Sequence, residues 1–290
     1  MSTRVLPLEL EQTIFELAAL DSPSRIPVLL LVAWRVHHWL EPLLYRTILI
    51  AGGLSRTTVY PHLPFHALRA SINGKDARYR KLAMHARSLF IPHYISLADR
   101  EVLCKAFPHL MNLYTTNNET LHATVPHLKQ LHAPPRVLQL HSPTVATNFA
   151  SLTHLHLFVG NEEVPWSAGL TLQSNWAALQ RLPSLSHLAL RKDPGESARA
   201  AVLQSCTALQ VLLIICGIWN TNMAPQSPWL EDPRLVFLVT PKDHNGPEMW
   251  QRDALSGFVD DWWEKAEEWV NKRKNGTVSV EKYMMSLTEE

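Results

Sequence analysis

A short leucine-based pattern recurs through the middle of the chain and restricts the folds that the chain can adopt. Each copy has a small residue or proline, a leucine two positions later, a second leucine three positions beyond it, and an apolar residue after two more. The first leucines of the copies are Leu110, Leu128, Leu152, Leu185, Leu209 and, in a looser copy, Leu235. Three of the five intervals between them span 24 to 26 residues, and residues 86–89 fit an earlier copy. One such unit cannot cover its own apolar face, so the units must stack and share a core.

The segments between the copies complete the prediction of the fold class. Helical patterns cover 97–107, 172–182 and the alanine-rich stretch 196–204, whereas 132–150 shows none. A strand, a helix and a second strand in the same direction require crossover connections, and hence a parallel sheet. The period lies in the range of leucine-rich repeats, which place one strand in each unit of 20–29 residues. For residues 81–240 we therefore expect an α/β fold, an irregular leucine-rich-repeat solenoid with a parallel sheet.

The first fifty residues predict a small helical module. Leu10, Ile14 and Leu17 recur at helical spacing after Pro7, and proline suits the first turn of a helix. After a turn at 21–24, we expect a second helix that starts near Pro27 and breaks at 41–42, a short third element, and a strand at 48–50. Three short helices make a thin core, so a module of this size often completes itself against a partner.

This segment, 1–50, resembles an F-box. The pattern of that family begins with Leu-Pro, continues with Glu-Leu and places Ile-Phe on the first helix, as Leu6-Pro7, Glu9-Leu10 and Ile14-Phe15 do here. The apolar run at 29–32 and Trp39 match the second helix of the family, although 32–35 departs from its Val-Cys-Lys/Arg-x-Trp sequence. The chain as a whole looks like the F-box-like proteins with irregular leucine-rich repeats that are abundant in mushroom-forming (basidiomycete) fungi.

The resemblance implies a role in protein recruitment. An F-box docks on the Skp adaptor of a cullin–RING (SCF-type) ubiquitin ligase, and the repeat domain presents a target protein. Carried over by position, the adaptor-binding residues are Leu6, Pro7, Leu10, Ile14, Val32 and Trp39. Helical spacing by itself favours an interface for Leu6 and Pro7 and a core position for Ile14 and Leu17. The alternative is a protein-binding leucine-rich-repeat scaffold with a degenerate F-box and no ligase role, in which Leu6 and Pro7 pack under the repeats.

Two further segments flank the repeats. Residues 51–80 predict an irregular connector, because glycine-containing turns interrupt them. Residues 241–290 form an acidic tail in which 254–274 predict an amphipathic helix, with Trp262, Ala266 and Trp269 on one stripe. We expect this Trp-rich helix to cap the solenoid, as terminal units of stacked folds do. Trp263 should point about 100° away from Trp262 and be exposed.

The sequence does not name the target protein. The strand positions that do not carry leucine are expected on the concave side of the sheet, where a target could bind. These positions are Asn112, Gln130, Thr153, Ser186 and Gln210.

Motifs of metal binding and catalysis do not occur in the sequence. The 15 histidines include no His-Glu-x-x-His, and the cysteines include no Cys-x-x-Cys. A Gly-x-Ser-x-Gly elbow and a glycine-rich phosphate loop are also lacking. We therefore expect no metal, no cofactor and no catalytic residues. An enzyme of an unrecognised type would need a pocket that joins His154 or His156 to a carboxylate.

Charge, hydropathy and cysteine content bear on partners and compartment. The balance of 27 basic against 26 acidic residues argues against a nucleic-acid partner. The longest apolar runs, 28–33 and 211–216, are far shorter than the roughly 20 residues of a membrane span. Three cysteines, Cys104, Cys206 and Cys216, cannot form a paired framework and indicate a reducing compartment. We therefore expect an intracellular protein of the cytoplasm or nucleus.

Overall fold

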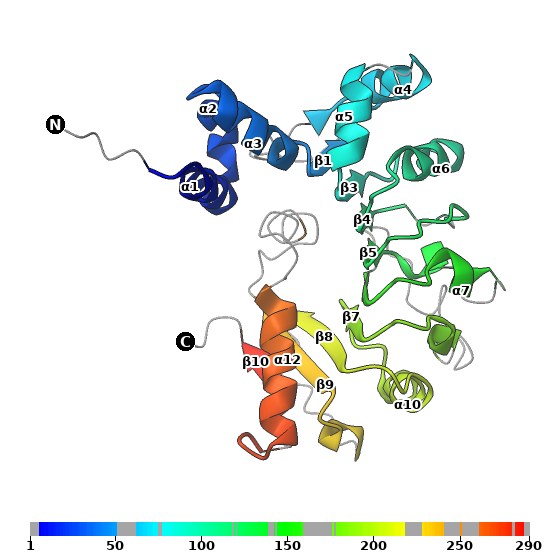
Figure 1. Cartoon of the computed structure of the whole chain (residues 1–290). Coiled ribbons are helices and arrows are strands. Elements are labelled where there is room, and N and C mark those ends of the chain that lie inside the picture. The colour runs from blue at the N-terminus through cyan, green and yellow to red at the C-terminus, as the bar shows by residue number, and fades with distance from the viewer. Residues whose placement is uncertain are drawn as a thin grey trace.

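Parallel strands dominate the architecture. The computed structural model describes residues 6–50, 62–74, 77–117, 119, 121–138, 142, 144–158, 176, 178–217, 228–240, 250, 261–279 and 282–286. Within these ranges, ten strands form one open sheet in the order β2-β1-β3-β4-β5-β6-β7-β8-β9-β10, and every neighbouring pair is parallel. From β3 onward each strand pairs with the next one along the chain, so the units stack as the repeats predicted (Figure 1).

The strands are β1 (Thr47–Ile50), β2 (His62–Leu63), β3 (Ser88–Ile91), β4 (Asn112–Thr115), β5 (Gln130–Ala133), β6 (His154–Leu157), β7 (His187–Leu190), β8 (Val211–Gly217), β9 (Leu235–Thr240) and β10 (Met284–Ser286). The α-helices are α1 (Leu8–Asp21), α2 (Ile26–Leu29), α3 (Trp34–Leu44), α4 (Phe65–Gly74), α5 (Ala77–His85), α6 (Leu97–Ala106), α7 (Val145–Asn148), α10 (Glu196–Ser205) and α12 (Asp261–Lys274). Short 3-10 turns are η1 (Pro23–Arg25), η2 (Pro135–Leu138), η3 (Ala178–Arg181) and η5 (Pro228–Glu231).

The second leucine of each copy forms one row across the sheet. The paired residues are Leu113, Leu131, Leu155, Leu188 and Leu212. All five are buried in the main core, on the side of the sheet that faces α6 and α10. Those helices confirm the predictions for 97–107 and 196–204, whereas the described part of 172–182 contains the 3-10 turn η3. Figure 1 shows α5, α6, α7 and α10 outside the arc of strands and α12 inside it.

The last copy of the repeat lies in a different register from the one that the sequence predicts. Leu235 pairs with Leu212, so it occupies the place of a second leucine and not the place of Leu209. The reason is local. Gln210 separates Leu209 from the first residue of β8, whereas the turn at 232–234 leads directly into β9, so Leu235 is itself the first residue of that strand.

Two predictions for the N-terminal third are corrected by the helices observed there. The connector predicted as irregular contains α4 and begins α5, and Leu68 of α4 is buried in the main core. The second helix of the module is only α2, and the third, α3, runs through Pro42. Pro42 is tolerated there because it lies near the end of the helix, where the missing N–H removes a single backbone hydrogen bond.

The C-terminal helix does not cap the end of the sheet as predicted. Trp262, Trp263 and Val270 of α12 pack against inner-face residues of β7, β8 and β9. The outer edge is formed by β10, which pairs with β9. Since α12 covers a face of the sheet, Trp263 is buried and the prediction of its exposure is wrong. None of the helices in the described part of the chain has the length and apolar character to cross a membrane.

We predict that Leu188→Ala lowers the free energy of unfolding by about 2–5 kcal/mol, because it leaves a cavity in the leucine row. Val102→Ala on α6 is the matched control, since Val102 is exposed and its loss should change stability by less than about 0.5 kcal/mol. Urea denaturation followed by circular dichroism measures both. Equal stability of the two variants would contradict a shared leucine core.

Candidate functional site

The N-terminal helices α1 to α3 hold a small core of their own. Ala19, Ile26, Val36 and Leu40 are buried together there, separate from the main core. An ion pair between Arg35 and Glu11, with 2.7 Å between Nη2 and Oε1, joins α3 to α1. The module therefore has a small apolar core of its own.

Many apolar side chains of these helices nevertheless face solvent. They are Leu6, Leu8, Leu10, Ile14, Leu17, Leu20, Val28, Leu31, Val32 and Trp34. Leu31 is 85% exposed and Trp34 is 84% exposed. Clusters of exposed apolar side chains on otherwise polar surfaces mark interaction sites. We call these ten side chains the apolar surface of the helical module.

The structure places the predicted adaptor-binding residues as follows. Leu6, Pro7, Leu10, Ile14 and Val32 are exposed, whereas Trp39 is half-buried and packs against the small core. The core position predicted for Ile14 and Leu17 is therefore wrong, because α3 covers the opposite face of α1. Leu6 and Pro7 do not pack under the repeats, which was the feature expected of the scaffold alternative.

A second candidate region is the inner face of the sheet. Aromatic rings stack across it: Tyr114 lies 5.2 Å from Phe90 and 5.1 Å from Phe158, measured between ring centroids. Trp250 covers these rings and donates a hydrogen bond from Nε1 to Asn112 Oδ1, at 2.9 Å. No sequence pattern indicated a role for Trp250, because it lies outside the repeats.

The predicted target-binding positions do not form an open concave surface. Asn112 and Gln130 are buried. The hydroxyls of Thr153 and Ser186 donate hydrogen bonds to backbone carbonyls of the neighbouring unit. Among the five positions, only Gln210 is exposed. The inner face is filled by side chains of the same chain.

Histidines on the inner face are held neutral by burial. The Nδ1 atoms of His132 and His156 lie 3.2 Å apart, so one ring donates a hydrogen bond to the other. Burial, together with the charge of Arg191, lowers the pKa of His156 to about 3. The pKa of His132 also lies well below its ordinary value because of burial. The rings therefore behave as neutral hydrogen-bonding and packing groups at physiological pH.

The three cysteines carry no reactive thiol. Burial raises the pKa of Cys104 to about 12 and those of Cys206 and Cys216 to about 11. A nucleophilic or redox-active cysteine requires the opposite shift, toward the thiolate.

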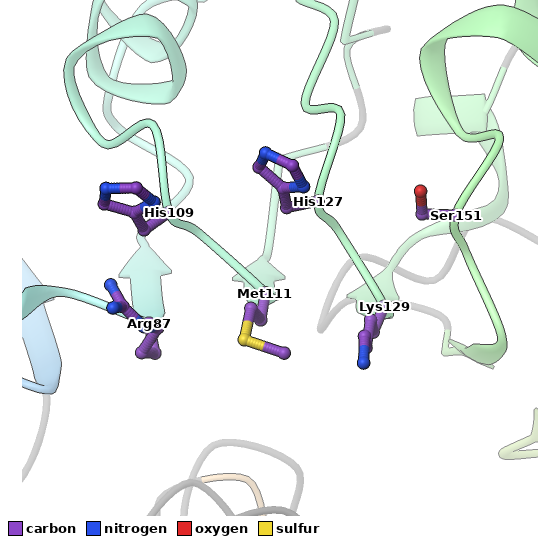
Figure 2. A pocket seen from close by; sticks show the side chains of 6 residues that line it. All are labelled: Arg87, His109, Met111, His127, Lys129 and Ser151. Atoms are coloured by element: carbon purple, nitrogen blue, oxygen red, sulfur yellow. The ribbon is translucent and has the colours of Figure 1, made fainter.

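A cationic hollow of about 240 Å³ lies at the edge where β3, β4 and β5 begin. Figure 2 shows its lining side chains, which are Arg87, His109, Met111, His127, Lys129 and Ser151. Arg87, Met111 and Lys129 each directly precede a strand, so they occupy one repeat phase. Alignment of the copies could therefore have revealed this hollow. No carboxylate of the described residues forms an ion pair with Arg87 or Lys129.

No protein-family model matches the chain, and no curated protein sequence matches it. Among the described residues, the apolar surface of the helical module is the largest set of exposed apolar side chains.

We predict that the free energy of unfolding decreases as the pH falls from about 6.5 toward 3. In that range the unfolded chain binds protons on His132, His154 and His156 that the folded chain excludes. His156→Gln should reduce the slope by up to about 1.4 kcal/mol per pH unit, the value for one proton. Val102→Ala, at an exposed position, removes no titratable group, so it is the control and should leave the slope unchanged. Urea titrations at several pH values measure the slopes, and equal slopes for the two variants would contradict the prediction.

Proposed function

We propose that the chain is a substrate-recruiting, F-box-like adaptor of a cullin–RING (SCF-type) ubiquitin ligase. In this proposal the helical module binds a Skp-type adaptor and the repeat domain binds a target protein, with no chemistry by the chain itself. The observation that carries the proposal is the exposure of Leu6, Pro7, Leu10, Ile14 and Val32. These residues were assigned to the adaptor face from the F-box resemblance alone.

The packing of the module supports a docking role for these side chains. Leu10, Ile14 and Leu17 lie four and three residues apart, so they share one face of α1. That face is exposed although the small core on the other side of α1 is complete. Exposed apolar side chains at such spacing serve as anchors when a helix binds a complementary groove.

The filled inner face limits where a target protein could bind. In this proposal the target contacts the edges of the repeats, where half-buried Arg87 and exposed Lys129 line the cationic hollow and form no ion pair with a carboxylate of the described residues. Such a hollow suits an acidic segment of a partner.

We expect the purified chain to retain a purified Skp-type adaptor in a pull-down, and Leu10→Asp/Ile14→Asp to abolish retention. The physical reason is that two charges would be buried without partners in an apolar interface. Leu6→Ala/Pro7→Ala should weaken binding at least about fivefold, because truncation of an interface anchor costs more than about 1 kcal/mol. Surface plasmon resonance quantifies the affinities.

Met84→Ala is the matched control, because Met84 is an exposed apolar residue on α5, outside the helical module. It should bind as the wild type does, and circular dichroism should show all variants folded. A folded wild-type chain that does not bind the adaptor would reject the ligase role and favour the alternative, a protein-binding repeat scaffold with a degenerate F-box.

A further inference from the structure

Two histidines and a glutamate meet where α12 packs on the inner face of the sheet. They are His154 of β6, His187 of β7 and Glu267 of α12, and their ligand atoms all lie within 4.8 Å of one another. The two imidazole rings stack with 4.2 Å between centroids, and Glu267 Oε1 lies 2.8 Å from His187 Nε2. The edges of both rings contact Trp263.

A hydroxyl group lies beside Nδ1 of each ring. Thr153 Oγ1 lies 3.1 Å from the carbonyl oxygen of Lys129 and 2.9 Å from His154 Nδ1. Ser186 Oγ lies 3.2 Å from the carbonyl oxygen of Thr153 and 2.8 Å from His187 Nδ1. When each hydroxyl donates its one proton to the carbonyl, it accepts a hydrogen bond from Nδ1–H, and the neutral ring then carries a lone pair on Nε2.

That tautomer leaves the contact with Glu267 incomplete. His187 is almost fully buried, and its Nε2 has no hydrogen-bond partner of acceptable geometry in spite of the nearby carboxylate. A lone pair and a carboxylate oxygen at 2.8 Å repel each other unless a positive charge lies between or beside them.

We propose that His154 Nε2, His187 Nε2 and the carboxylate of Glu267 bind a divalent transition-metal ion of the zinc class. Two neutral imidazoles and one carboxylate are a ligand set that zinc accepts, with water at the fourth position. The Nδ1–H bonds to Thr153 and Ser186 are the outer contacts that orient metal-binding histidines. The sequence did not indicate this site, because its ligands come from three separate elements without a local motif.

Binding of the ion requires the ligand atoms to move closer together. Zinc–ligand bonds of about 2.0–2.1 Å place tetrahedral ligand atoms roughly 3.3 Å apart, so the three atoms must approach one another. The side chain of Glu267 is half-exposed, and the two stacked rings must tilt for both Nε2 atoms to bind one ion. The bound ion would join β6, β7 and α12 and so hold the C-terminal helix on the sheet.

The test uses the full chain, stripped of metal with a chelator and titrated with zinc chloride by calorimetry. We expect one high-affinity zinc ion per chain, no comparable binding of magnesium, and a higher melting temperature with zinc. Glu267→Gln and His187→Gln should each weaken zinc binding at least tenfold. Glu264→Gln, an exposed glutamate three residues earlier on α12, is the matched control and should bind as the wild type does.

Cobalt provides a second readout, because tetrahedral Co²⁺ bound by histidine absorbs visible light and its spectrum should disappear in Glu267→Gln. Zinc binding that is unchanged in both Glu267→Gln and His187→Gln would overturn the proposal, since it would place the ion on other histidines. Failure of the folded wild-type chain to bind one zinc ion would also overturn it and would assign the contact to a plain ion pair.

Discussion

The pairing of short parallel strands is the constraint on which the rest of this structure depends. Each unit contributes four or more residues to the sheet, and alternate side chains point to opposite faces. On the outer side the leucine row packs against helices such as α6 and α10. On the inner side the same geometry displays Phe90, Tyr114, His156 and Leu213, which are too apolar or aromatic to face water as a group. The inner face therefore needs a cover.

The chain supplies that cover from its C-terminal part. Trp250 covers the rings of β3 and β4, and α12 covers β7 to β9 with Trp262 and Trp263. The concave surface that a curved sheet would otherwise offer is thus occupied internally. In the described chain, two surfaces remain for partners: the apolar surface of the helical module and the cationic hollow. These two surfaces lie on different elements.

Neighbouring units and the covering segment orient several buried polar side chains on the inner face, as Trp250 orients Asn112 and His156 lies beside His132. The Thr153–His154 and Ser186–His187 pairs repeat one arrangement in consecutive units. Four buried nitrogens of the described inner face have no hydrogen-bond partner of acceptable geometry: His156 Nε2, His187 Nε2, Trp262 Nε1 and Trp263 Nε1. Among these four, His187 Nε2 lies 2.8 Å from a carboxylate oxygen, that of Glu267.

The sequence by itself determined the parallel sheet, the leucine row and helices α6 and α10, because these depend on local spacing repeated along the chain. It also contains the F-box resemblance from which the adaptor-binding residues of the N-terminal module were assigned. The tertiary structure alone decided the exposure of Ile14 and Leu17, since a helix with apolar residues on two sides can bury either one. It likewise decided that Trp263 is buried and that Glu267 meets His187. Each of these depends on which distant element packs against the residue, and local periodicity carries no information on that choice.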